Sequence, residues 1–317
     1  MILLCDCGST KAEWVVLDGN DVAKRFITNG FNPNFSDNTT IKEIAASAKE
    51  SIDNQDVNKI FFYGSGCGSE ANKIKVAMIF AMVFNINDIE IFPDSLGACH
   101  ALFGRNEGVA CILGTGSNAC FYDGECITES MVSLGYIMGD EGSGCHIGKR
   151  IVHDYFYKIM PNELLVKFDE KYHLDRETFL KKVYQGEAPS RYLAEFARFA
   201  YENTDNQYVK DIISGCFEEF LSSFRLERNE EESNGEILSL RNQSNAKAEK
   251  GFIRQANAFA SSGLDSARND KIGFVGSIAF AFRAILLQVL ENHNIRCVKI
   301  LKNPMDGLIE YYKNAIA

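Results

Sequence analysis

Two short segments of the chain combine glycine with hydroxyl side chains in a pattern that could bind phosphate. The first, from Asp6 to Lys11, reads DCGSTK, and the second, from Gly114 to Asn118, reads GTGSN. Each follows a short apolar run and leads into another apolar run that ends in an Asp-Gly pair. Turns of this kind present backbone N–H groups that bind anions. We therefore interpret the two segments as copies of one strand–turn–strand unit that would together clamp a polyphosphate.

The side chains of the first segment add chemistry to its backbone. Gly8 allows close approach of a ligand, Ser9 and Thr10 supply hydroxyl donors, and Lys11 supplies a cation. Asp6 ends the preceding apolar run, where its carboxylate could hold Mg²⁺ through water beside phosphate oxygens. The corresponding candidates in the second segment are Gly114, Thr115, Gly116 and Ser117. Either segment alone could be an ordinary hairpin turn, and neither fits the P-loop pattern GxxxxGK followed by Ser or Thr.

Two further segments offer carboxylates. Asp94 follows the apolar run 89–92 and precedes a helical pattern. It could cap that helix, or it could be the general base that takes a proton from a hydroxyl during phosphoryl transfer. Asp140 and Glu141 are enclosed by glycines at 135, 139, 142 and 144, a composition that disfavours regular structure. Such a loop could bring carboxylates to sugar hydroxyls, or it could be a solvated acidic loop.

Two more segments have weaker signals. Residues 29–35, NGFNPNF, offer the amides of Asn32 and Asn34 together with aromatic rings. Polar groups and rings are typical of a sugar site, although a plain turn explains the same pattern. Gly276 and Ser277 join an apolar run to a helical pattern, where they could lie against the adenosine end of a nucleotide.

The elements that would position these residues follow from hydrophobic periodicity. Residues 2–28 read as three strands joined by tight turns, and a second set of three strands begins at 109. Further strands are expected at 59–63, 89–92, 271–276 and 296–301. Helices are expected at 41–51, 72–84, 95–103, 278–292 and 307–316, and the stretch 149–224 is mainly helical, most clearly at 193–201 and 209–224. The segment 225–270 has few large apolar residues, which predicts a flexible insertion; a frame error in the coding sequence would give a similar composition.

Length and composition limit the class of protein. The 317 residues suit two domains of moderate size, and the net charge of −10 argues against a general nucleic-acid binder. The first strand shows no signal-peptide pattern, and no apolar run is long enough to span a membrane. The ten cysteines show no paired CxxC arrangement and no histidine spacing typical of zinc sites. Several lie inside apolar runs, so most are expected to be reduced core residues. These features predict a cytoplasmic protein.

These segments, in this order, resemble the sugar kinase, heat-shock chaperone and actin superfamily of ATPases. More narrowly, they are similar to the N-acetylglucosamine kinase group within the family that includes the benzoyl-CoA reductase activase ATPases. The resemblance covers about 1–224 and 271–317, and 225–270 departs from it. It rests on the two phosphate motifs at 6–11 and 114–117, the catalytic-aspartate motif at 94–95, the GDEGSG signature at 139–144, the adenosine motif at 275–277 and the closing segment at 303–308.

The resemblance implies an α/β fold of two ribonuclease-H-like (actin-like ATPase) domains around a central cleft. The expected domains are 1–106, 107–300 with a helical insertion, and a C-terminal helical segment, 301–317, that could pack back on the N-terminal domain. ATP and Mg²⁺ are the implied cofactors, and Asp94 is the implied base that activates the 6-hydroxyl of N-acetylglucosamine. The sugar would be bound by Asn32, Asn34, Gly66, Asp140 and Glu141, and the adenosine by Gly276 and Ser277.

Other functions on the same scaffold stay open. Within the kinases, the substrate could be N-acetylmuramic acid or another hexosamine. An activator ATPase would couple ATP hydrolysis to an iron–sulfur cluster shared by a dimer, and its ligands would have to be cysteines at a surface or interface. A non-catalytic sugar sensor is a third reading. The expected partner is a small-molecule sugar, with no nucleic acid and no membrane, and the chain could form a homodimer.

Overall fold

The computed structural model describes residues 1–52, 55–225 and 271–316, so nearly all of the insertion expected at 225–270 lies outside the described residues. The chain divides into two compact units. The first unit comprises Met1–Ala110, Tyr122–Ile127 and Asn303–Ala317, and the second comprises Cys111–Phe121 and Thr128–Lys302. Each unit is built on one five-stranded sheet.

The sheet of the first unit has the order β3-β2-β1-β4-β5. Its strands are β1 (Ile2–Cys7), β2 (Lys11–Asp18), β3 (Asp21–Asn29), β4 (Lys59–Gly64) and β5 (Ile89–Pro93). The first three form an antiparallel meander, and β4 and β5 continue the sheet parallel to β1. Parallel strands require crossover connections, which helices supply here.

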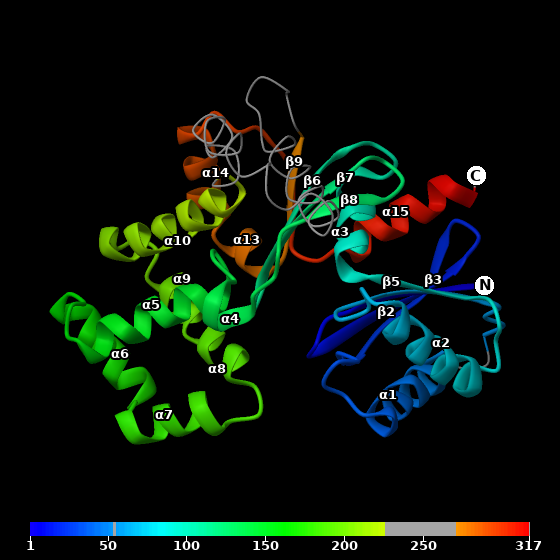
Figure 1. Ribbon diagram of the computed structural model, residues 1–317, viewed down its shortest axis with the longest axis horizontal. Coiled ribbons are helices and arrows are strands. Elements are labelled where there is room, and N and C mark those ends of the chain that lie inside the picture. The colour runs from blue at the N-terminus through cyan, green and yellow to red at the C-terminus, as the bar shows by residue number, and fades with distance from the viewer. Residues whose placement is uncertain (53–54, 226–270, 317) are drawn as a thin grey trace, which may run out of the picture. The chain divides into compact units, whose positions relative to one another are not determined.

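Helices cover both faces of this sheet (Figure 1). Helices α1 (Asn38–Ser51) and α2 (Glu70–Phe84) contact each other on one face, and α3 (Asp94–Phe103) and α15 (Met305–Ile316) contact each other on the opposite face. Side chains of β4 alternate between the two layers, as the period of a strand requires. Phe62 packs on Phe80 of α2, whereas Tyr63 donates or accepts a hydrogen bond with Tyr312 of α15 at 2.7 Å.

The second sheet has the order β10-β9-β6-β7-β8. Its strands are β6 (Gly108–Leu113), β7 (Ser117–Tyr122), β8 (Ile127–Ser130), β9 (Ile272–Val275) and β10 (Cys297–Leu301). When the strands of each sheet are counted along the chain, both sheets have the same order, 3-2-1-4-5. The duplicated unit seen in the sequence is therefore a duplicated sheet, and the predicted α/β class with two ribonuclease-H-like units is confirmed.

Most helices of the second unit come, in the sequence, between its third strand, β8, and its fourth strand, β9. They are α4 (Gly135–Met138), α5 (Gly144–Phe156), α6 (Asn162–Tyr172), α7 (Arg176–Gln185), α8 (Pro189–Glu195), α9 (Ala197–Glu202) and α10 (Gln207–Arg225), followed after β9 by α13 (Ser277–Ala281) and α14 (Arg283–Asn292). None of the helices in the described residues is both long and apolar enough to cross a membrane.

Several element boundaries differ from the expectations. The helix expected over 278–292 is interrupted at Phe282, whose φ of −103° and ψ of 23° leave the helical region. The helix expected over 193–201 is divided between α8 and α9 at Phe196, although this residue keeps helical dihedral angles, with a φ of −72° and a ψ of −16°. Both aromatic rings are buried, and tertiary packing overrides the continuous helical pattern at these positions. One short helix, α4, forms within the glycine-rich stretch that was expected to be irregular.

Candidate active site

The carboxyl ends of three parallel strands define the candidate site of the first unit. Cys7 of β1 is in register with Gly64 of β4, and Gly64 is in register with Pro93 of β5. The residues that follow these strands therefore leave the sheet at one edge. Ligands of open α/β sheets bind outside the carboxyl ends of the strands, and Asp94 and the first glycine-serine turn lie there.

The first glycine-serine turn is a tight connection between β1 and β2. The Gly8 N–H donates to the Lys11 carbonyl at 3.0 Å, and the segment from Gly8 to Lys11 is exposed. Gly30, directly after β3, packs against the backbone of this turn. A Cβ at Gly30 would lie 2.0 Å from the Gly8 carbonyl oxygen and 2.5 Å from the Lys11 nitrogen. Only glycine allows this close approach of the two backbones.

Asp94 is the first residue of α3, and Pro93 is the N-cap. The Asp94 side chain is therefore not the N-cap that the sequence left open. Its Oδ1 accepts a hydrogen bond from the Ser95 N–H at 2.9 Å, and it also accepts one from the Ser65 hydroxyl. Burial raises the pKa of Asp94 above its ordinary value despite these two bonds.

Asp6, at the end of β1, has a pKa raised to about 7. Burial is the largest cause, the negative charges of Asp94 and Glu13 add to it, and the charge of Lys11 partly opposes it. The negative charges of Asp94 and Glu13 thus both act on the Asp6 carboxylate beside the first turn. A cation at this edge would relieve their repulsion, which is the environment that fits the Mg²⁺ role predicted for Asp6.

The sugar residues predicted in the first unit form one cluster. The Asn32 side-chain oxygen accepts from the Asn34 N–H at 3.0 Å. Gly66 has a φ of +78°, and a Cβ there would lie 2.1 Å from the Asn32 Oδ1. Asn72 of α2 joins the cluster, because its Nδ2 donates to the Asn34 Oδ1 at 2.7 Å and to the Gly66 carbonyl at 2.8 Å. Two loops and a helix start are thereby fixed together.

In the second unit, three predicted motifs meet at the turn from Gly114 to Ser117. The Gly144 and Cys145 N–H groups, in the first turn of α5, donate to the carbonyls of Gly114 at 2.8 Å and Thr115 at 3.0 Å. On another side of the turn, Gly276 has a φ of +132°, and a Cβ there would lie 2.1 Å from the Leu113 carbonyl oxygen. The GTGS, GDEGSG and VGS motifs are therefore parts of one structure.

Asp140 is turned toward this second turn. Its Oδ1 accepts a hydrogen bond from the Ser117 N–H at 3.1 Å, and a Cβ at Gly116 would lie 2.8 Å from the same oxygen. Asp140 has a φ of +63°, a backbone conformation that aspartate tolerates better than most residues. Burial raises its pKa, whereas the hydrogen bond from Ser117 and the charge of Lys149 lower it.

The remaining predicted residues of the second unit differ in exposure. Glu141 is half-buried and Ser277, the first residue of α13, is exposed. Ser117 is buried, and its hydroxyl has no hydrogen-bond partner among the described residues. An orphaned buried hydroxyl is unusual, and at a turn rich in backbone N–H groups it fits a site that receives a phosphate oxygen.

Several residues of the site were missed in the sequence. Gly30, Ser65 and Asn72 act through contacts between loops that are distant in the chain, so that spacing gives no signal for them. The missed residues of α5 are His146 and Lys149, which follow the GDEGSG motif. His146 contacts Gly142, and Lys149 donates to the Tyr136 carbonyl at 2.6 Å.

Comparison with known protein families identifies the family of this chain. The sequence profile described as the BadF/BadG/BcrA/BcrD ATPase family matches residues 5–237. The chain belongs to this ATPase family. No curated protein matches it.

Solved structures share the fold of this family member. A proposed N-acetylglucosamine kinase from Porphyromonas gingivalis is 30% identical, with a TM-score of 0.83 and 100% of both chains covered. A second proposed N-acetylglucosamine kinase, from Chromobacterium violaceum, is 13% identical with a TM-score of 0.65 over 98% of each chain. A ROK-family glucokinase from Streptomyces griseus, solved with glucose and AMPPNP, is 10% identical with a TM-score of 0.52, covering 98% of this chain and 97% of its own. The latter two show the fold alone.

Proposed function

We propose that the protein is an ATP-dependent kinase that phosphorylates the 6-hydroxyl of an amino sugar, with N-acetylglucosamine as the substrate and Asp94 as the general base. The observation that carries this proposal is the environment of Asp94. Its carboxylate is held by Ser65 and Ser95 beside the first phosphate turn, and burial raises its pKa. A carboxylate with a raised pKa is a better proton acceptor near neutral pH than an ordinary one.

The nucleotide assignment rests on the two glycine-serine turns. Backbone N–H groups of both turns, the Lys11 ammonium and the unpartnered Ser117 hydroxyl would contact the phosphates. Asp6 would hold Mg²⁺ through water, and that ion would supply neutralisation of phosphate charge. Gly276 and Ser277 would lie at the adenosine. Membership of an ATPase family supports this part of the proposal.

The acceptor assignment rests on amides and carboxylates near the turns. Asn32 and Asn34 are fixed by Gly66 and Asn72, so their remaining polar atoms are preorganised for sugar hydroxyls. Asp140 keeps one carboxylate oxygen on Ser117, and its other oxygen could accept from the sugar. The full-length likeness to the Porphyromonas gingivalis protein, described as a proposed N-acetylglucosamine kinase, favours that sugar.

An activator ATPase fits the cysteines less well. Eight of the ten cysteines are buried, Cys126 is exposed and Cys297 is partly exposed. A cluster shared by two subunits would need more cysteine thiolates at a surface. Burial also raises the pKa of Cys5, Cys67 and Cys111, which disfavours the thiolate form.

None of the ten cysteines forms a disulfide, in keeping with the cytoplasmic location that we propose.

A coupled assay of ADP release over a panel of sugars tests the proposal. The panel contains N-acetylglucosamine, N-acetylmannosamine, glucosamine, glucose and N-acetylmuramic acid, each with Mg²⁺ and ATP. We expect the highest kcat/KM with N-acetylglucosamine, and mass spectrometry and NMR should place the phosphate at the 6-position. Protein with Asp94→Asn controls for contaminating kinases. ATP hydrolysis with no phosphorylated sugar would overturn the kinase assignment, and preference for another hexosamine would overturn only the substrate.

A further inference from the structure

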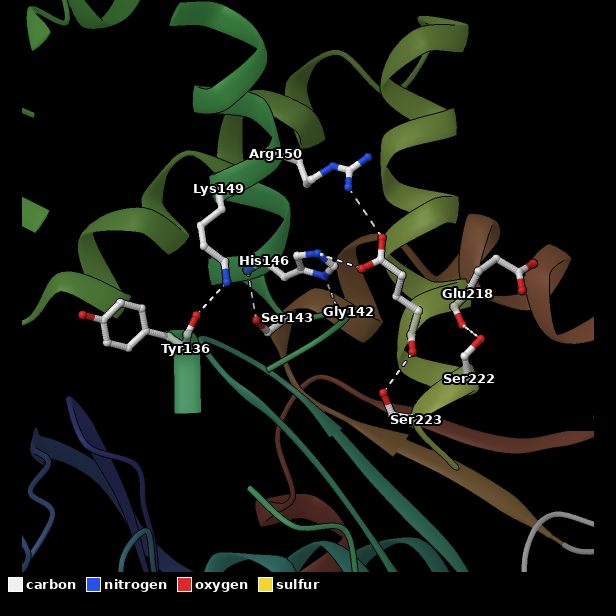
Figure 2. Close-up of polar contacts among 10 residues, drawn as sticks. Tyr136, Gly142, Ser143, His146, Lys149, Arg150, Glu218, Ser222 and Ser223 are labelled. Atoms are coloured by element: carbon white, nitrogen blue, oxygen red, sulfur yellow. Dashed lines mark hydrogen bonds and ion pairs between the residues drawn. The ribbon is translucent and has the colours of Figure 1, made fainter. Parts of the chain in front are cut away.

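His146 lies in the first turn of α5, directly after the GDEGSG loop (Figure 2). The residue is buried. Its backbone N–H donates to the Ser143 hydroxyl at 3.1 Å, which is an ordinary N-cap. Its ring makes a second contact with the same loop. The Gly142 N–H donates to the His146 Nδ1 at 3.1 Å. Residue 146 therefore holds the loop through both its backbone and its side chain.

This second hydrogen bond fixes the chemical state of the ring. A backbone N–H can only donate, so Nδ1 must be the acceptor and the single ring proton of neutral imidazole must be on Nε2. The Nε2 atom faces the Glu219 Oε2 of α10 at 3.4 Å. A doubly protonated ring would place an N–H against the Gly142 N–H. The observed geometry is therefore that of neutral histidine.

Charged groups of three segments act on the ring. Glu219 of α10 and Glu141 of the loop favour its protonation, whereas Lys149 and Arg150 of α5 oppose it. Arg150 also shares Glu219, with its Nη1 3.6 Å from Oε1. Burial is the largest effect and lowers the pKa of His146 below its ordinary value. The neutral state required by the hydrogen bond is thus also the state that the surroundings favour.

The loop held by His146 carries Asp140. Ser143 closes the loop, because its N–H donates to the Asp140 carbonyl at 3.2 Å, and the Asp140 carboxylate accepts from the Ser117 N–H. The Gly142 backbone has a φ of +71°. A single residue, Glu141, thus separates Gly142, whose amide is bound by His146, from Asp140, whose carboxylate is bound by the Ser117 N–H. Movement of Gly142 would be passed directly to Asp140.

We propose that His146 is a positioning residue of the sugar site. Its neutral imidazole holds Gly142 so that Asp140 keeps one oxygen on Ser117 and presents the other to the acceptor sugar, and protonation of the ring releases the loop. This inference rests on the proposed kinase function for its sugar readout. Its structural half, the state of the ring and the order of residues 139–145, can be tested without activity.

The first experiment reads the ring directly. Long-range ¹H–¹⁵N NMR of the protein labelled on histidine nitrogens distinguishes the two neutral tautomers, and the His146→Asn variant assigns the signal among the five histidines. We expect the Nε2–H tautomer at pH 7.5 and protonation only below the pH at which an exposed histidine titrates. An Nδ1–H tautomer or a charged ring at pH 7.5 would overturn the proposal.

The second experiment uses three variants. His146→Leu removes the acceptor, whereas His146→Asn keeps an oxygen near the Nδ1 position but cannot titrate. His153→Leu is the matched control, because His153 lies on the same helix and its side chain is exposed. Hydrogen exchange of residues 139–145 should accelerate in His146→Leu, return toward the wild-type rate in His146→Asn and stay unchanged in His153→Leu. Equal exchange in all four proteins would overturn the role in holding the loop.

The sugar readout follows from the same variants. We expect His146→Leu to raise the KM for the amino sugar roughly tenfold, the effect of losing one buried hydrogen bond, with the KM for ATP changed less than twofold. Calorimetric sugar binding without nucleotide should weaken in the wild type as the pH falls through the lowered pKa of His146. Because Asp140 titrates in both proteins, the difference between wild type and His146→Asn isolates the histidine.

The outcomes separate this inference from the proposed function. If no sugar is bound or phosphorylated but the tautomer and exchange results hold, the kinase proposal fails while the loop-holding role stands. If the sugar panel succeeds and His146→Leu raises the KM for ATP and lowers stability without a change in the KM for sugar, the positioning role is wrong. Identical pH dependence of sugar binding in wild type and His146→Asn would also exclude release by protonation.

Discussion

At the residue scale, the sugar role that we propose for Asp140 depends on its two carboxylate oxygens having different partners. One oxygen accepts the Ser117 N–H of the second phosphate turn, and a carboxylate has further lone pairs for a sugar hydroxyl. We expect Asp140→Asn to raise the KM for the amino sugar by roughly tenfold or more, because hydrogen bonds to charged groups are the stronger ones. Asparagine tolerates the φ of +63°, so this variant isolates the charge. Steady-state kinetics in both substrates measure the effect, and an unchanged sugar KM would contradict it.

Asp140→Ala adds a backbone effect to the loss of the side chain. Alanine is disfavoured at positive φ by roughly 1–2 kcal/mol, so thermal unfolding should shift for alanine but little for asparagine. Comparison of the two variants separates sugar binding from loop strain.

Substitution of Asp94 tests the general-base step that we propose. Replacing it with Asn keeps the hydrogen-bond acceptor for Ser95 but removes the proton acceptor. We expect kcat to fall by a factor of about 10²–10⁴, the range of general-base catalysis, while the KM for ATP changes little. The physical reason is that the nucleotide contacts that we propose lie on the two glycine-serine turns rather than on Asp94. Rapid-quench measurement of a single turnover checks this, and near-normal turnover would remove Asp94 from the role of base.

Among the elements, the first glycine-serine turn, which we propose binds phosphate, depends on a glycine outside it. A methyl group at Gly30 would overlap the Gly8 carbonyl and the Lys11 nitrogen, and backbone atoms cannot swing aside as a side chain would. We expect Gly30→Ala to displace the turn, to raise the KM for ATP at least tenfold and to lower the free energy of unfolding by about 1–3 kcal/mol. Gly215→Ala in α10 is the control, since a Cβ there meets nothing within 4 Å. Wild-type ATP kinetics in Gly30→Ala would argue against this role.

Strands and turns with local sequence signals could be predicted, whereas contacts between distant segments could not. Both strand–turn–strand units and the VGS junction were found because glycine turns and period-two burial are local signals. The support that Gly30 gives to Gly8 was not, because Gly8 lies in the turn between β1 and β2 whereas Gly30 follows β3, and the two meet only through folding. The position of Asp94 at the first helical residue, after a proline N-cap, was also ambiguous, since Asp and Pro both occur at helix starts. The contact of His146 with Gly142 depends on a ring orientation that no spacing encodes.

For the whole molecule, the buried ionisable groups have opposing effects on stability. A carboxyl group with a raised folded pKa contributes stability that is present below the unfolded pKa and is lost as the pH rises through the folded value. A histidine with a lowered pKa, such as His100 at about 4, contributes stability above the unfolded pKa that is lost as the pH falls through the folded value. Asp6, with a pKa of about 7, therefore contributes to the stability of the folded state at acidic pH, and His100 contributes to it at neutral pH.

This balance predicts that Asp6, for which we propose a role in holding Mg²⁺, lowers the stability of the protein above neutral pH. The Asp6 pKa is shifted from 3.8 to about 7, so the ionised carboxylate at pH 8 lowers the free energy of unfolding by about 4 kcal/mol. We expect Asp6→Asn to raise the free energy of unfolding at pH 8 and to differ much less from wild type at pH 5, where protonated Asp6 carries no charge. Urea denaturation at both pH values measures this.

Addition of Mg²⁺ and ATP provides the second half of that experiment. A ligand that binds only the folded state stabilises it in proportion to the logarithm of its concentration over Kd. At pH 8 the wild type should gain more stability from Mg²⁺ and ATP together than Asp6→Asn does, because the cation that we propose would offset the negative charges of Asp94 and Glu13 that act on Asp6. An Asp6→Asn protein that is no more stable than wild type at pH 8 would contradict the destabilising effect of ionised Asp6. An Asp6→Asn protein that gains as much stability from Mg²⁺ and ATP as wild type would show that the cation does not bind beside Asp6.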